Sequence, residues 1–130
     1  MTSKAKKEKK KLTTAEEEIM LVLWRLEKAF IKDIRKEFPN PRPAYNTIAT
    51  VLRVMENKGF VSHEVSGVFY QFYPLVMKDT YAKSQAKSLL RMYFESSLAK
   101  FIAAFAKEEN LSLADMDQIN RIFTKVKISS

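Results

Sequence analysis

The chain has 130 residues, and 23 lysines and arginines against 15 aspartates and glutamates give it a formal net charge of +8. It contains no cysteine and one histidine, which excludes disulfides, thiol nucleophiles, cysteine-based metal sites and most acid–base constellations. Its length fits one domain, or a small domain with an appendage, and its 46% of apolar residues can supply a core.

Residues 1–11 form a basic tail, in which six lysines and one glutamate sum to a charge of +5. The tail is nearly free of apolar residues, so we expect it to be disordered. It could bind phosphates without sequence preference, or serve only to keep the chain in solution. No apolar stretch follows that approaches the roughly 20 residues of a membrane span, and none resembles a signal peptide. We therefore expect a soluble, cytoplasmic protein.

The segment after the tail predicts two helices. Thr13 and Glu16 have the spacing of a capping box, and apolar residues then repeat at helical spacing as far as Leu26. A shorter helix is predicted over residues 31–38. Three prolines in the next five residues hold the chain extended, because each proline disfavours a helical conformation in the residue before it.

A third helix is predicted from about Pro43 to Lys58, where Gly59 can adopt the left-handed cap. One face of this helix is apolar and consists of Ile48, Val51, Leu52 and Met55. The opposite face is short, polar and free of acidic residues, and consists of Asn46, Ala49, Thr50, Arg53 and Asn57. Such a face suits an anionic partner, although an ordinary solvated helix surface is the alternative interpretation.

The next stretch is rich in aromatic and β-branched residues. Residues 60–65 and 68–73 are predicted to be two strands joined by Ser66–Gly67, which makes a hairpin. Three more helices are predicted, at about residues 77–94, 97–108 and 113–126.

The large apolar residues of these last helices exceed what about 50 residues can bury alone. We therefore expect them to pack against a second copy of the chain across a two-fold axis. The alternative is that they pack on the preceding elements of a monomer. The candidate dimerisation residues are Tyr81, Leu89, Leu90, Tyr93, Leu98, Phe101, Ile102, Phe105, Ile119, Ile122 and Phe123.

No catalytic constellation can be assembled from the sequence. His63 lies beside Glu64 in a predicted strand, so the two side chains point to opposite faces. The only glycines are Gly59 and Gly67, which excludes a phosphate-cradling glycine loop. We expect no enzyme activity, no cofactor and no metal site.

The order of these elements predicts a mainly α fold with a small β-hairpin wing. A winged helix-turn-helix domain would occupy residues 12–74, and a helical dimerisation domain would occupy residues 75–126. In this fold the third helix enters the major groove of DNA. The candidate base-reading residues are Asn46, Ala49, Thr50 and Arg53, and the candidate phosphate or positioning residues are Arg42, Tyr45, Thr47 and Lys58.

Two other classes of protein share these features. A non-specific architectural DNA-binding protein would use the same charge without reading bases. A winged-helix protein-interaction module would bind nucleic acid only weakly, through its basic tail. Preference for one DNA sequence separates a repressor from both.

The sequence also resembles a known family. Residues 44–53, AYNTIATVLR, and residues 56–60, ENKGF, resemble the recognition helix of the penicillinase-repressor family, which includes methicillin-resistance and copper-responsive repressors. Residues 12–24 and 97–112 also resemble that family, and the match extends over about residues 12–126. The resemblance implies a homodimeric transcriptional repressor that binds a palindromic DNA operator.

In the penicillinase branch, a membrane-bound metalloprotease sensor triggers cleavage of the repressor between an asparagine and a phenylalanine. The matching positions are Ala104 and Phe105, so this sequence keeps the phenylalanine and lacks the asparagine. The alternative role for Phe105 is that of an ordinary core or interface residue. The copper-responsive branch binds metal through a cysteine-rich tail, which this sequence lacks.

Overall fold

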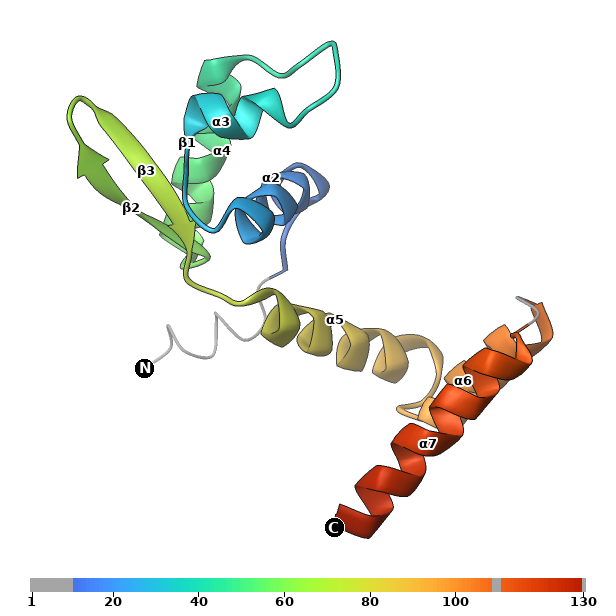
Figure 1. Ribbon diagram of the computed structural model, residues 1–130. Helices are drawn as coiled ribbons and strands as arrows, with labels where there is room; N and C mark the ends of the chain where they lie inside the picture. Colours follow the sequence, from blue (N-terminus) through green and yellow to red (C-terminus); the bar gives the residue numbers. More distant parts are fainter. Residues whose placement is uncertain (1–10, 109–110, 130) are drawn as a thin grey trace. The chain divides into compact units, whose positions relative to one another are not determined.

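The computed structural model of the chain describes residues 11–108 and 111–129 (Figure 1). The chain divides into two compact units, residues 1–85 and residues 86–130. The sequence suggested a division after residue 74, and the boundary lies later because the start of the next helix packs on the first unit. The predicted disorder of the basic tail concerns residues outside the described ranges, apart from Lys11.

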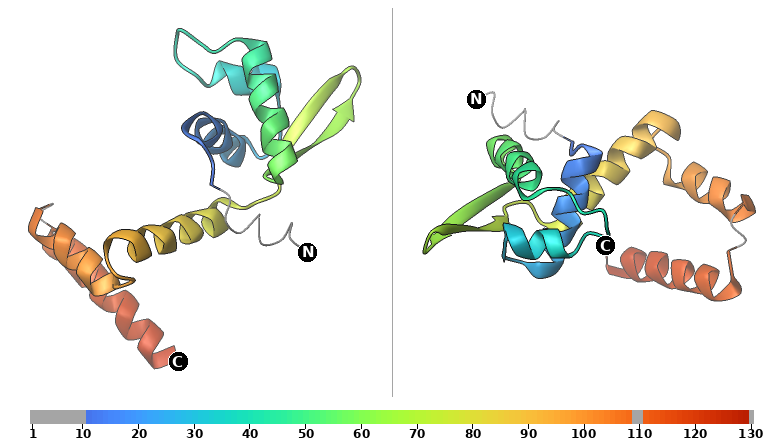
Figure 2. Two further views of the ribbon diagram at one scale, coloured as in Figure 1. Left: turned by 180° about the vertical axis from the view of Figure 1, so that it is seen from behind. Right: turned by 90° about the horizontal axis from the view of Figure 1, so that it is seen from above.

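The first unit has the predicted winged helix-turn-helix fold. Figure 2 shows its helices beside a small sheet from two further sides. The elements in chain order are α2 (Thr14–Leu26), β1 (Ala29–Phe30), α3 (Ile31–Lys36), α4 (Tyr45–Lys58), β2 (Val61–Ser66), β3 (Phe69–Pro74) and the start of α5 (Lys78–Tyr93). The strands form an antiparallel sheet in the order β1-β3-β2.

Helix α2 begins with the capping box that the sequence predicts. The backbone N–H of Thr13 donates to Oε1 of Glu16 at 2.9 Å, and the N–H of Glu16 donates to Oγ1 of Thr13 at 3.2 Å. These two bonds satisfy donors that the first turn of a helix otherwise leaves unpaired.

Helix α4 begins at Tyr45 and ends at Lys58. Its C-cap is Gly59, which has φ of +90° in the left-handed region, as expected of a glycine cap. The turn between α3 and α4 is held by Arg35, whose Nε donates to the carbonyl oxygen of Pro43 at 2.8 Å. This bond ties the entry of α4 to α3.

The hairpin differs from its prediction by one residue. Ser66 pairs with Phe69, so the two-residue turn is Gly67–Val68, and Gly67 takes the left-handed conformation at φ +66°. The short strand β1 was not predicted, because its two residues carry no alternation that a sequence pattern could detect. It pairs with β3 and attaches the helices to the wing.

The core of the first unit joins the apolar faces of all these elements. Its largest fully buried side chains are Met20, Leu23, Ile34, Ile48, Leu52, Met55 and Val61. Tyr81 of α5 also belongs here, which corrects its prediction as a dimerisation residue. Its hydroxyl accepts from the N–H of Leu12 at 2.9 Å, and its ring lies 6.0 Å from that of Trp24 and 5.9 Å from that of Phe60.

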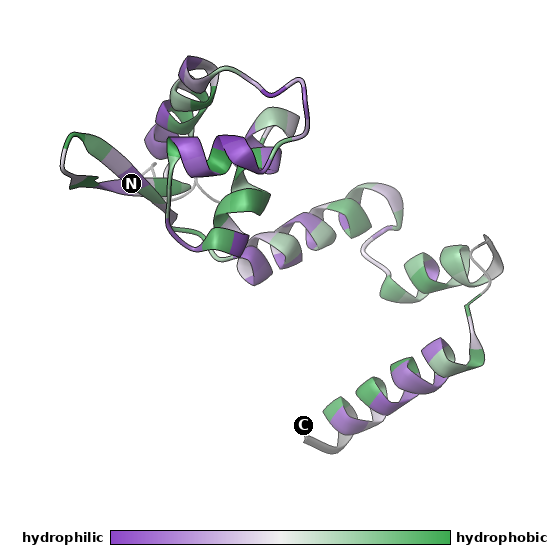
Figure 3. Cartoon of the chain, turned by 45° about the horizontal axis from the view of Figure 1, so that its top comes forward, coloured by the Kyte–Doolittle hydropathy of each residue, from purple (hydrophilic) through white to green (hydrophobic). Residues whose placement is uncertain are grey.

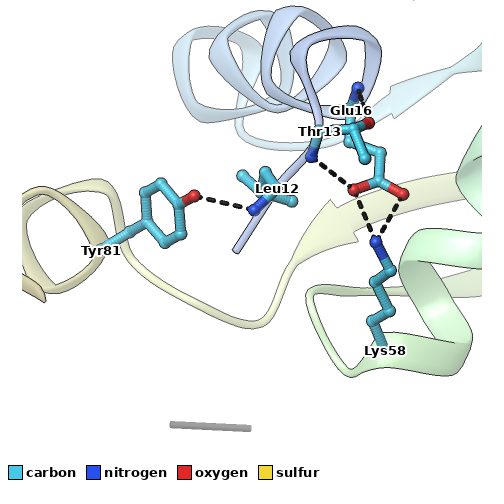
Figure 4. A network of polar contacts seen from close by, with 5 residues as sticks. All are labelled: Leu12, Thr13, Glu16, Lys58 and Tyr81. Carbon is cyan, nitrogen blue, oxygen red and sulfur yellow. Dashed lines mark hydrogen bonds and ion pairs between the residues drawn. The ribbon is translucent and has the colours of Figure 1, made fainter. Parts of the chain in front are cut away.

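An ion pair joins the first helix to the third (Figure 4). Nζ of Lys58 lies 2.9 Å from both carboxylate oxygens of Glu16, whose side chain is 6% exposed. Burial by itself would raise the pKa of Glu16. The hydrogen bonds from Thr13 and the charge of Lys58 outweigh that effect and hold the pKa below its ordinary value of 4.5.

The second unit consists of the end of α5, α6 (Leu98–Glu108) and α7 (Leu113–Ser129). Phe94 and Phe101 meet edge to face at 5.4 Å, and Phe101 lies 4.9 Å from Phe105. Within residues 86–106 and 111–126, however, no side chain is buried. Apolar and polar residues alternate along α7 (Figure 3), so this unit has amphipathic helices without a closed core of its own.

The buried ion pair predicts how stability depends on pH. Because the folded-state pKa of Glu16 is depressed, its contribution is present above about pH 4.5 and is lost as the pH falls through the folded-state pKa. Glu16→Gln should lower the free energy of unfolding near neutral pH by about 1–3 kcal/mol and weaken this acid dependence. Urea unfolding at a series of pH values measures both effects.

Glu17→Gln is the matched control, because Glu17 is exposed on the same turn of α2. An equal loss of stability in both variants would contradict the role of the Glu16–Lys58 pair.

Candidate nucleic-acid interface

The outer face of α4 is polar and exposed because its inner face is fixed in the core. Ile48, Leu52 and Met55 are no more than 1% exposed, which sets the rotation of the helix about its axis. The exposed residues of the outer face are Asn46, Thr47, Thr50, Arg53 and Asn57. Ala49 is half-buried at the edge of this face.

The side chains of this face differ in what they can offer a partner. Oγ1 of Thr50 donates to the backbone carbonyl of Asn46 at 2.9 Å, so its hydroxyl hydrogen is used within the helix. Arg53 forms no hydrogen bond or ion pair within the described ranges of the chain. Its guanidinium group is therefore the strongest unengaged donor on the face.

The first turn of α4 also faces outward. Ala44 at the N-cap supplies no side-chain hydrogen bond, and the first turn contains no acidic residue. Tyr45 is 43% exposed and lines a hollow of about 180 Å³ between the helix and the wing. The other lining residues are Phe30, Ile31, Lys32, Phe69 and Tyr70. Sequence reasoning missed Lys32, because only the folded turn brings it beside Tyr45.

Arg42 remains exposed in the turn before α4. Its Nε donates to the carbonyl of Phe38 at 3.0 Å, and Nη2 lies 3.4 Å from the carbonyl of Lys36. These contacts orient the guanidinium group near the C-terminus of α3 while its other donors face solvent.

Lys58 has a different role from the predicted one. Its ammonium group is bound to the buried carboxylate of Glu16, and its side chain is 26% exposed. Moving it to a phosphate would leave Glu16 buried without its counter-charge, which is energetically costly. Lys58 is therefore a structural residue and is removed from the phosphate-contacting set.

The wing is apolar rather than basic. Residues 60–77 contain no lysine or arginine, and the exposed fraction is 68% at Val65, 87% at Val68 and 56% at Phe69. A wing of this composition cannot hold phosphates by charge.

The clearest contact between wing and helix joins His63 of β2 to Glu56 of α4. Nδ1 of His63 lies 2.8 Å from Oε1 of Glu56. The imidazole stacks on Tyr70 at 4.3 Å and lies 5.4 Å from Phe72. Glu64, the next residue, pairs instead with Lys28 at 3.0 Å on the other face of the strand, as strand alternation predicts.

The described residues contain no cluster of histidine, aspartate and glutamate side chains that could hold a metal ion. No helix among them is long and apolar enough to cross a membrane.

Comparisons with known proteins identify relatives that cover most of the chain. A family model described as penicillinase repressor matches residues 12–125. The methicillin resistance regulatory protein MecI of Mammaliicoccus sciuri is 23% identical over 115 residues, which cover 88% of this chain and 94% of the relative. The penicillinase repressor of Bacillus licheniformis is 22% identical over 117 residues, which cover 89% of this chain and 91% of the relative.

Among solved structures, the adhesin competence repressor AdcR from Streptococcus pyogenes aligns with 97% of this chain and 87% of its own, at 14% identity and a TM-score of 0.44. That likeness is too distant to support an argument about this chain.

Removal of the two cations of α4, Arg53 and Lys58, should affect stability to different degrees. Lys58→Met should lower the free energy of unfolding by about 1–3 kcal/mol, because it leaves the Glu16 carboxylate without its partner. Arg53→Ala should change the free energy of unfolding by no more than about 0.5 kcal/mol, because its side chain is exposed and forms no hydrogen bond or ion pair with the residues that the structure describes. Denaturant unfolding measures both variants, and a large loss for Arg53→Ala would contradict its assignment to an outward-facing surface.

Proposed function

The chain belongs to the penicillinase repressor family, and we propose that it is a sequence-specific DNA-binding transcriptional repressor. It would act in the cytoplasm as a homodimer on a palindromic operator. The observation that carries this proposal is the exposed, acid-free outer face of α4, whose rotation is fixed by three buried residues on the opposite side.

Base readout is assigned to four side chains of this face. Arg53 can donate two hydrogen bonds to O6 and N7 of guanine, and Asn46 can make the corresponding pair with adenine. Ala49 and the methyl group of Thr50 suit the methyl group of thymine. The internal hydrogen bond of Thr50 supports an apolar role for it, since its hydroxyl hydrogen is already donated.

Positioning is assigned to residues at the entry of α4. Arg42, Tyr45 and Thr47 are exposed there and can reach the phosphates beside the groove. The uncapped backbone N–H groups of the first turn add donors and a favourable helix dipole.

Dimerisation is assigned to the second unit. Leu89, Tyr93, Leu98, Phe105, Ile122 and Phe123 are exposed, and Leu90, Phe101, Ile102 and Ile119 are half-buried. A unit with this much uncovered apolar surface and no buried side chain in its described part supports pairing with a second copy. A two-fold dimer would present two copies of α4 to successive major grooves about 34–36 Å apart.

The family resemblance implies relief of repression by cleavage between Ala104 and Phe105, triggered by a membrane-bound metalloprotease sensor. Both residues lie inside α6, and Phe105 packs against Phe101 at 4.9 Å. A protease requires an extended segment, so cleavage here would first require this helix to unwind. Phe105 is 43% exposed, and this uncovered aromatic side chain supports its role as an interface residue.

Selection from random-sequence duplexes with the full chain, followed by gel-shift titration, tests the proposed function. The selected duplex should be palindromic and should bind about a thousandfold or more tighter than a scrambled duplex. Equal affinity for both duplexes would indicate an architectural DNA-binding protein. Weak binding to both, abolished by moderate salt, would indicate a protein-interaction module.

Arg53→Ala should weaken binding to the selected duplex by about 1–3 kcal/mol and relax sequence preference at one position in each half-site. The matched control is Arg25→Ala, which removes the same charge from an exposed position on α2. Unchanged binding by Arg53→Ala over a range of salt concentrations would overturn the assignment of Arg53 to base readout.

Ile122→Asp should convert the dimer to a monomer, because it places a charge in the proposed apolar interface, and should weaken operator binding with it. Sedimentation velocity and gel shift measure the two effects. Thr124→Asp adds the same charge at an exposed position on the opposite side of α7 and should leave the dimer intact. A wild-type chain that sediments as a monomer would contradict the dimer.

A further inference from the structure

The proposed base-reading arginine has an acidic neighbour on its own helix. Arg53 and Glu56 are three residues apart on α4, a spacing that places side chains close together on a helix surface. Both line a hollow of about 210 Å³ beneath the wing, together with His63 and Tyr70. A carboxylate at this position can interfere with base readout, because it attracts the guanidinium group of Arg53.

In the structure the Glu56 carboxylate is bound by His63 of the wing and not by Arg53. Its Oε1 lies 2.8 Å from Nδ1 of His63, and the two side chains are 33% and 28% exposed. With Nδ1 protonated, His63 donates to the carboxylate whether the ring is neutral or cationic. Arg53, by contrast, has no ion-pair partner among the residues that the structure describes.

The imidazole is itself fixed by the wing. It stacks on Tyr70 with an angle of 26° between the ring planes and lies opposite Phe72, with which it pairs across the strands. The sheet register therefore determines where the donor of His63 lies. A shift of one residue would turn this side chain to the other face of the strand.

We propose that His63 is a positioning residue for DNA recognition: it binds the Glu56 carboxylate and so keeps the Arg53 guanidinium free to reach a base. The inference rests on the proposed function of α4. It gives the apolar wing a role that requires no phosphate contact, because the wing carries the donor that binds the Glu56 carboxylate of α4.

The test uses the full chain, the selected palindromic duplex and two substitutions at one position. His63→Phe keeps an aromatic ring against Tyr70 and Phe72 but removes the donor, and it should weaken binding about fivefold to tenfold, the scale of one hydrogen bond. His63→Asn restores a donor near the position of Nδ1 and should bind within about twofold of wild type.

A double-mutant cycle separates positioning from packing. When Glu56→Gln is added to His63→Phe, the carboxylate is gone, and affinity should return to within about twofold of Glu56→Gln alone. In an Arg53→Ala background, His63→Phe should cause no further loss. Glu64→Gln is the matched control, because it removes a carboxylate from the neighbouring residue, which faces Lys28.

Three results would overturn the proposal. They are unchanged binding by His63→Phe, a loss that persists when Glu56→Gln is added, and an equal loss in the Arg53→Ala background. Thermal unfolding of each variant identifies a folding defect, and if His63→Phe fails to fold, the comparison of His63→Asn with His63→Gln under the same cycle decides the question. Failure of the proposed function is distinct, because wild type would then show no preference for the selected duplex over a scrambled one.

Discussion

The rotation of α4 about its own axis is the constraint on which the proposed interface depends. Three buried side chains hold one face inward, and the pairing of Lys58 with the buried Glu16 attaches the end of the same helix to the start of α2. Glu16 also closes the capping box of α2, so one carboxylate serves the first helix and orients the third. A packed core tolerates little rotation. The polar face of α4 is therefore presented rigidly, as base readout requires.

The helices of the first unit could be predicted from the sequence because each has a local signal. The capping box at Thr13, the helical repeat of apolar residues and the glycine cap at Gly59 all act over a few residues, and the structure has α2, α3 and α4 where they indicate. The strand β1 and the exact hairpin turn could not be predicted, because they depend on pairing with β3. The boundary between the units was also missed, since it depends on where Tyr81 packs.

The candidate site residues also divide into those that a local pattern predicts and those that depend on contacts between distant parts of the chain. Exposure of Asn46, Thr50 and Arg53 follows from the helical period, which the sequence displays. The partner of Lys58, Glu16, lies 42 residues away in the chain. No local sequence pattern distinguishes a lysine that pairs with a buried glutamate from a lysine that is available to bind a phosphate. His63 and Glu56 likewise come together only through the register of the wing. Charge alone therefore does not separate a candidate phosphate contact from a lysine that pairs within the fold, as Lys58 does with Glu16.

Each unit lacks something that a second copy of the chain would supply. The first unit has a closed core but only one copy of the proposed reading face, and the second unit has no buried side chain in its described part. Both observations favour dimerisation as a requirement for function. A single copy of the reading face would contact one major groove, which would limit its affinity and specificity. The second unit exposes apolar side chains on every one of its helices and has no buried side chain in its described part. Covering that surface with a second copy would stabilise the second unit and also supply the second reading face. Linking two reading faces raises affinity through effective concentration, without any new contact to DNA. The same association that completes the hydrophobic core of the second unit would thus also convert a weak half-site reader into an operator-specific repressor.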